Sequence, residues 1–222
     1  IKEEEQLCQN FLDTPVGELE YDLLITDQLE ARLNKHPLIS LINHIQMEFT
    51  KADISSCCLG NDVSGFRKKI TVRDIIGTYI YPNTLVVKEL SGEVLKQSIE
   101  KSAEFFMVKN NEIVISDEFN HPKLQLYAYD MYDGIDYTLD ISKPIGSRVT
   151  ILLFKNKPIE FDKNYSVVMN NYRSSGGGDY HFIKDSKILH DTQTEVIELL
   201  IDYIYKNKKI VIPHKENITI VK

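Results

Sequence analysis

Two segments of the sequence combine aromatic rings, amides and glycines in patterns that suit binding of a flat polar ligand. The first segment is Tyr79-Ile-Tyr-Pro-Asn-Thr84. Pro82 has a fixed φ and disfavours a helical conformation at Tyr81, so we expect a loop between a helix and a strand. Such a loop could present the ring of Tyr81 and the amide of Asn83 together. A plain turn with packed tyrosines is the alternative, and this segment alone favours the plain turn.

The second segment is Asn170-Asn-Tyr-Arg-Ser-Ser-Gly-Gly-Gly-Asp-Tyr180, which follows a predicted strand. Three consecutive glycines are entropically costly, but they permit positive φ angles and close approach of a ligand to the backbone. Tyr172 supplies a large ring before the glycines, and Asp179 supplies a carboxylate after them. A wide flexible turn is the alternative. Because a turn needs only one or two glycines, this segment favours ligand binding.

The two segments together predict a site for a nucleoside or nucleotide. Two tyrosines on separate loops can sandwich a base, and each stacking contact is worth about 1–3 kcal/mol. The amide of Asn83 and the carboxylate of Asp179 would then bind base edges or ribose hydroxyls.

The motifs of a self-contained enzyme are absent from the sequence. It has no Gly-Lys-Ser/Thr phosphate loop, no G-x-S-x-G nucleophile turn, and no C-x-x-C or H-E-x-x-H metal motif. The three cysteines do not form a disulfide framework, and Cys57 and Cys58 are predicted to lie in a buried strand. We therefore expect no catalytic residue and no metal site within this chain.

Composition predicts a globular protein and excludes several classes of partner. The 222 residues carry 26 Lys and Arg against 33 Asp and Glu, a net charge of −7. This charge argues against binding of a nucleic-acid polymer, although a single nucleotide remains compatible with it. No apolar run approaches the roughly 18 residues that a membrane span needs. The chain begins at Ile1 rather than Met, which we interpret as a fragment or processed product.

Hydrophobic periodicity predicts an α+β fold, a single compact domain with a mixed β-sheet packed by helices. We expect a helix and connector over residues 1–19, and a domain over 20–222 that opens with helical structure over 20–51. A capping box, Thr192-x-x-Glu195, is predicted to start the last helix. Strands are expected at 53–59, 84–90, 113–115, 135–141, 148–154, 165–169 and 218–221, and further helices at 71–76 and from 91 onward.

Over residues 15–222, the chain resembles the C-terminal domain of the bacterial 5′-nucleotidase and 2′,3′-cyclic-nucleotide 2′-phosphodiesterase/3′-nucleotidase family. The order and spacing of several motifs carry this resemblance. They are His36-Pro37, Ala52-Asp-Ile-Ser55, Tyr81-Pro-Asn-Thr84 with Ser91-Gly92, Tyr132-Asp-Gly-Ile-Asp-Tyr137 with Pro144, Asn170-Asn-Tyr-Arg173, and Gly176-Gly-Gly-Asp179.

The resemblance implies half of a hydrolase. In this family an N-terminal metallophosphoesterase domain with two divalent metal ions performs the hydrolysis, and the C-terminal domain binds the nucleoside, nucleotide or cyclic nucleotide. The resemblance implies an inactive isolated chain and an extracytoplasmic location: periplasmic, cell-wall-associated or secreted. By motif match, Tyr81 and Tyr172 would clamp the base, Asn83 would contact the base, and Asp179 would contact the ribose. Arg173 and Gly178 lie in the same motifs and complete the predicted binding set.

One departure from the family pattern favours the cyclic-phosphodiesterase branch. The 5′-nucleotidase branch has a phosphate-binding Arg after a glycine-rich turn upstream of the first ring. Here that region is Gly60-Asn-Asp-Val-Ser-Gly-Phe-Arg67, so the Arg is displaced. The 5′-nucleotidase branch, and a non-catalytic nucleotide-binding or surface-interaction module, are the alternatives.

Overall fold

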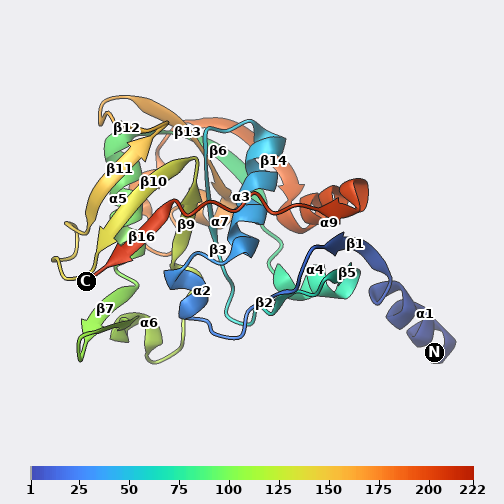
Figure 1. The fold of residues 1–222 in the computed structure, drawn as a ribbon. Helices are drawn as coiled ribbons and strands as arrows, with labels where there is room; N and C mark the ends of the chain where they lie inside the picture. The colour runs from blue at the N-terminus through green and yellow to red at the C-terminus, as the bar shows by residue number, and fades with distance from the viewer. Residues whose placement is uncertain (1) are drawn as a thin grey trace.

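The computed structural model describes residues 2–222 and is built around a five-stranded mixed sheet with the order β14-β6-β13-β3-β9 (Figure 1). Strands β13 and β3 are parallel, and the other neighbours are antiparallel. Four consecutive residues of β3 are buried, as expected of a strand covered on both faces. The bounds are Ile188–Glu195 for β14, Thr84–Ser91 for β6, Asn164–Asn170 for β13, Ile54–Cys58 for β3 and Asp130–Asp133 for β9.

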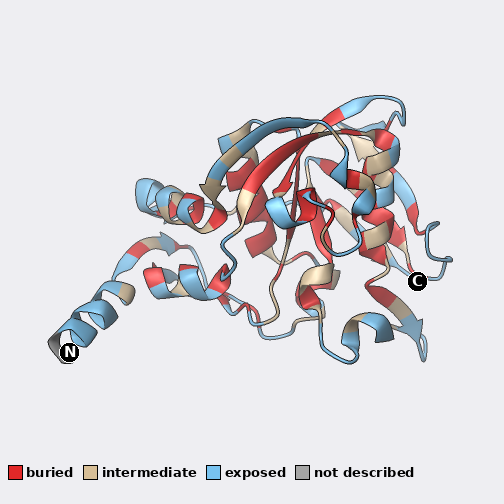
Figure 2. Cartoon of the chain, turned by 180° about the vertical axis from the view of Figure 1, so that it is seen from behind, coloured by how far each residue is buried: buried red, intermediate tan, exposed pale blue. Residues whose placement is uncertain are grey.

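Two long helices pack against this sheet, and their sequences explain where they begin. Helix α3 (Pro37–Thr50) starts with proline at its first position, where a missing N–H costs nothing. Helix α5 (Gly92–Ala103) is capped by Ser91, whose hydroxyl accepts from the N–H of Val94 at 3.2 Å. Figure 2 shows the buried residues gathered in the sheet and on the helix sides that face it.

A second sheet has four strands in the order β12-β11-β10-β16. The predicted alternation in β10 (Ile135–Asp140) is confirmed, because every second side chain is buried. Strand β16 (Ile218–Val221) pairs in parallel with β10, which confirms the predicted terminal strand. The remaining bounds are Val149–Phe154 for β11 and Lys157–Pro158 for β12.

Smaller elements complete the fold. Strand β1 (Pro15–Leu19) lies between β15 (Lys209–Ile210) and β5 (Lys69–Thr71), so the predicted connector is part of a three-stranded sheet. Helix α1 (Lys2–Leu12) extends away from the body and is largely exposed (Figures 1 and 2). The other bounds are β2 Leu23–Leu24, α2 Glu30–Leu33, β4 Gly65–Phe66, α4 Val72–Thr78, β7 Phe106–Lys109, β8 Glu112–Ile115, α6 Asp117–Asn120, a 3-10 turn Leu126–Ala128, α7 Asn171–Ser174, α8 His181–Lys184 and α9 Val196–Asn207.

The predicted α+β class and most of the predicted strands are confirmed, but two local predictions are wrong. Residues 20–29 are not helical. Asp27 accepts from the backbone N–H groups of Leu29 and Glu30 and holds a turn, whereas Asp22 accepts from the N–H of the distant Lys68. Thr192 does not cap the last helix. It lies in β14 and donates its hydroxyl to the carbonyl of Leu85, so α9 starts four residues later.

In the described residues 2–222, the longest apolar stretches fall short of what a helix needs to cross a bilayer.

A buried polar cluster of Lys35, Asp133 and Asn217 holds the C-terminal segment against the core. The Lys35 ammonium donates to Asp133 at 2.5 Å and to the side-chain oxygen of Asn217 at 2.6 Å. The side-chain amide of Asn217 donates to the carbonyls of Tyr132 at 2.8 Å and Ile135 at 2.6 Å. One asparagine therefore satisfies one buried cation and two backbone carbonyls.

We predict that Asn217→Ala lowers the free energy of unfolding by about 3 kcal/mol, because buried groups left without partners cost about 1–3 kcal/mol each. Urea denaturation measures the change. Asn207→Ala, at an exposed site on α9 with one hydrogen bond to Tyr203, is the matched control and should change stability by less than about 0.5 kcal/mol. An equal loss of stability in both variants would contradict the structural role of Asn217.

Candidate functional site

The pairing of β6 with β13 brings the two predicted ligand-binding segments together. These strands are antiparallel, with Asn170 opposite Leu85. The segment that enters β6 and the segment that leaves β13 therefore lie at the same end of the sheet. Strand β3, parallel to β13, also ends there at Cys58. Residues that are about ninety positions apart in sequence thus meet at one end of the central sheet.

A cleft of about 380 Å³ opens at this end of the sheet. Tyr81 and Tyr172 are 41% and 47% exposed, so both residues are accessible to a ligand. The residues that line the cleft are Cys58, Tyr81, Asn83, Lys123, Tyr127, Asn170, Tyr172 and Arg173. The structure thus brings together four of the six predicted site residues: Tyr81, Asn83, Tyr172 and Arg173.

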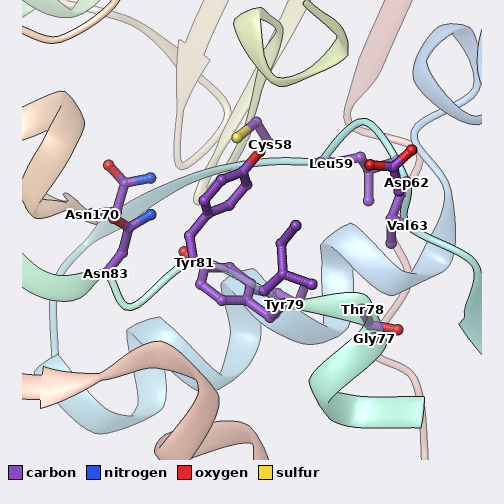
Figure 3. A pocket seen from close by; sticks show the side chains of 13 residues that line it. Cys58, Leu59, Asp62, Val63, Gly77, Thr78, Tyr79, Tyr81, Asn83 and Asn170 are labelled. Atoms are coloured by element: carbon purple, nitrogen blue, oxygen red, sulfur yellow. The ribbon is translucent and has the colours of Figure 1, made fainter. Parts of the chain in front are cut away.

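Tyr79 lies beside the two amides of the cleft. The residue is buried, and it lines a narrow extension of the cleft together with Asn83 and Asn170. Burial raises the pKa of Tyr79 well above its usual value, so the hydroxyl stays protonated. Figure 3 shows the two amides beside each other, with the ring of Tyr81 extending toward Cys58. Burial also raises the pKa of Cys58 to about 12, so its thiol is not a nucleophile at neutral pH.

Arg173 holds the glycine-rich turn in place. Its guanidinium is buried, donates to both carboxylate oxygens of Asp130 at 2.7 and 2.9 Å, and donates to the carbonyl of Gly177 at 2.8 Å. It also lies 4.1 Å from the ring centre of Tyr180. Burial acts to lower the pKa of Arg173, but the charge and hydrogen bonds of Asp130 outweigh it, so the pKa is raised. The charge of Arg173 is therefore neutralised within the protein.

Two glycines of the turn are required by their neighbours. A Cβ on Gly177 would lie 2.5 Å from the ring of Tyr172, so only glycine lets this ring lie against the turn. Gly178 has a φ of +67°, and a Cβ there would collide with the guanidinium of Arg173. Gly178 does not line the cleft; it makes room for the arginine beneath it.

Asp179 lies outside the cleft in this structure. Its side chain is 72% exposed and faces Lys101 at 3.7 Å and His181 at 3.8 Å. The residue adopts a φ of +65° at the end of the turn. Its predicted contact with a ribose stays a prediction.

The other four residues that line the cleft were not predicted as site residues: Cys58, Lys123, Tyr127 and Asn170. Asn170 could have been found, because it stands at the end of a predicted strand beside the predicted site. Lys123 and Tyr127 belong to a segment without a recognisable motif, and long-range contacts place it. The carbonyl of Leu126 in this segment accepts from the buried Arg32 at 3.0 Å.

Comparison with known proteins identifies the family. The model of the 5′-nucleotidase C-terminal domain matches residues 15–185, more than half of the chain. The chain belongs to this family. The resemblance inferred from the motifs is therefore confirmed at the level of the family.

Curated relatives of this 5′-nucleotidase C-terminal domain are much longer proteins. The trifunctional nucleotide phosphoesterase protein YfkN of Bacillus subtilis is 24% identical over 246 residues, which cover 95% of this chain and 16% of YfkN. The 2′,3′-cyclic-nucleotide 2′-phosphodiesterase/3′-nucleotidase of Salmonella typhimurium is 32% identical over 147 residues, 54% of this chain and 22% of that protein. The 5′-nucleotidase of Bos taurus is 27% identical over 220 residues, 91% of this chain and 32% of that protein.

Solved structures share the fold. A Staphylococcus aureus protein described as a candidate 5′-nucleotidase, solved in complex with α-ketoglutarate, superposes with a TM-score of 0.94 at 35% identity. The superposition covers 100% of this chain and 43% of that one. The 5′-nucleotidase precursor of Thermus thermophilus superposes with a TM-score of 0.81 at 21% identity, and the superposition covers 42% of that chain. At this identity the match supports a shared fold only.

Over residues 2–222, no three His, Cys, Asp or Glu side chains are grouped so that they could hold a metal ion. The polar groups that face the cleft are amides, hydroxyls and cations, which suit recognition of a ligand.

We predict that Gly177→Ala displaces the ring of Tyr172 from the cleft, because the added methyl group occupies the position of the ring. A crystal structure of the variant measures the displacement. Gly77→Ala is the matched control: like Gly177 it has no positive φ, but no atom lies within 4 Å of its new Cβ. This control should leave the ring in place, and an unmoved ring in Gly177→Ala would contradict the packing described here.

Proposed function

We propose that this chain is the substrate-binding domain of a metal-dependent phosphoesterase that hydrolyses nucleoside phosphates, and that Tyr81 and Tyr172 clamp the base. The observation that carries the proposal is the meeting of these two exposed rings in one cleft beside two amides. The family membership supports the same function, because the relatives named above are nucleotide phosphoesterases and nucleotidases.

The chemistry of the cleft fits a base and a sugar. Each tyrosine ring offers a π face, and stacking tolerates any base. The amides of Asn83 and Asn170 line the cleft and offer donors and acceptors for a base edge. Cys58 and Tyr127 complete the lining with uncharged side chains.

In this proposal the bond is broken by a separate metallophosphoesterase domain of the same protein. Two metal ions there would activate water and polarise the phosphoryl oxygen. This domain contributes by holding the base and ribose, so that the phosphate reaches the metals in a fixed orientation. An extracytoplasmic location belongs to the same proposal, and a snake venom 5′-nucleotidase among the relatives supports it.

We also propose that the protein belongs to the cyclic-phosphodiesterase branch of the family. The displaced Arg67, which is exposed and pairs with Asp74 at 3.6 Å, supports this branch. The relative with 32% identity is also a cyclic-nucleotide 2′-phosphodiesterase/3′-nucleotidase. The 5′-nucleotidase branch is the second candidate, because the Staphylococcus aureus neighbour matches the whole chain at 35% identity.

We predict that Tyr81→Ala and Tyr172→Ala each weaken the binding of adenosine about tenfold, since one stacking contact is worth about 1–3 kcal/mol. Isothermal titration calorimetry gives the dissociation constants. Tyr205→Ala, an exposed tyrosine on α9 that does not line the cleft, is the control and should bind as the wild type does. Unchanged binding in both cleft variants would eliminate the clamp.

We also predict that the purified chain releases no phosphate from 3′-AMP and does not open 2′,3′-cyclic AMP, with or without Mn²⁺. The reason is that the cleft provides binding groups but no metal ligands. A phosphate-release assay and chromatography of the products test this, with an unrelated phosphatase as the positive control. Metal-dependent turnover that persists through further purification would contradict the proposal that a separate domain breaks the bond.

A further inference from the structure

The cleft is lined by cationic side chains and by no acidic ones. None of the eight lining residues is acidic, although the whole chain carries a net charge of −7. Two of the eight are cationic. Arg173 is neutralised by Asp130, whereas Lys123 has no carboxylate partner within the described part of the chain. Lys123 is exposed and lines the cleft with the two tyrosine rings.

The backbone that carries Lys123 is held in place by the neighbouring loop. The Asn61 side chain donates to the carbonyl of Leu124 at 2.9 Å and accepts from the N–H of Leu126 at 2.8 Å. These two bonds bracket the segment just after Lys123. The position of the lysine beside the cleft is thus built into the fold.

A second cation lies buried below the same loops. Arg32 is fully buried and donates to five neutral oxygens, which belong to Gln28, Leu59, Gly60 and Leu126. Burial lowers the pKa of Arg32 to about 10, so it is charged at neutral pH. No carboxylate in residues 2–222 pairs with it. Its charge therefore adds positive potential to the region under Gly60 and Leu126.

One carboxylate, that of Asp62, lines a narrow extension of about 30 Å³ that shares Tyr81, Asn83 and Asn170 with the main cleft. Burial raises the pKa of Tyr81, and the charge of Asp62 adds to this rise. A phosphate would be repelled from this extension and attracted toward Lys123. The charge pattern thus orients a ligand as well as attracting it.

We propose that Lys123 is the residue by which the cleft distinguishes a nucleotide from a nucleoside, through a charge-assisted hydrogen bond from its ammonium to a phosphate oxygen. The inference rests on the proposed function, because it requires the base to lie between Tyr81 and Tyr172. It adds a specificity-determining contact for the phosphate. A lysine suits this role, since its ammonium is a compact charge with three donors on a flexible stem.

Isothermal titration calorimetry of the chain with adenosine and with 3′-AMP tests the inference. The wild type should bind 3′-AMP more tightly than adenosine, and NaCl should weaken only the binding of 3′-AMP. Lys123→Gln should weaken 3′-AMP binding about three- to tenfold and leave adenosine binding unchanged. Lys123→Arg should retain the preference. Lys157→Gln, on β12 away from the cleft, is the matched control and should retain it as well.

The outcomes separate the inference from the proposed function. If the wild type binds neither ligand, the proposed function fails. If it binds both ligands and Lys123→Gln leaves both dissociation constants unchanged, only the role of Lys123 is overturned. Equal weakening of adenosine and 3′-AMP would also overturn that role, because a contact with phosphate cannot affect a nucleoside.

Discussion

The antiparallel register of β6 and β13 is the constraint on which the rest of the site depends. With Leu85 opposite Asn170, the loop before one strand and the turn after the other leave the sheet at the same end. A shift of one residue would move Tyr81 and Tyr172 relative to each other and turn alternate side chains to the opposite face. The register is secured by buried residues on both strands, including Val87, Val167 and Val168.

Buried cations then tie the loops to this sheet. Arg173 joins the glycine turn to β9, and Arg32 joins the loops around Gly60 and Leu126. Lys88, in the centre of β6, donates to the carbonyls of Ile183 and Lys184 at 2.9 and 2.7 Å and holds α8 after the turn. Buried charges are costly unless they are fully hydrogen-bonded, so each of these contacts favours one loop arrangement. The cleft is therefore formed before a ligand arrives.

Local patterns in the sequence were sufficient for much of the fold and for part of the site. The helix predicted at 71–76, the alternation in β10 and the Pro82 loop depend on neighbours in sequence, and these predictions are confirmed. The segments that failed depend on distant partners. Residues 20–29 are held by the hydrogen bond from Lys68 to Asp22 and by the pairing of β2 with β4, and Thr192 is held by β6.

The cleft residues divide in the same way. Tyr81, Asn83 and Tyr172 were identified from their motifs. Lys123 was not, because its place depends on Asn61, more than sixty residues earlier. The exposed position of Asp179 likewise depends on the turn that Arg173 organises, which no local pattern encodes.

A crystal structure of this chain with adenosine tests the central claim most directly. The account predicts that the base lies between the rings of Tyr81 and Tyr172, with its edge facing the amides of Asn83 and Asn170. A nucleoside bound elsewhere on the molecule, or bound in the cleft without stacking on either ring, would contradict the account.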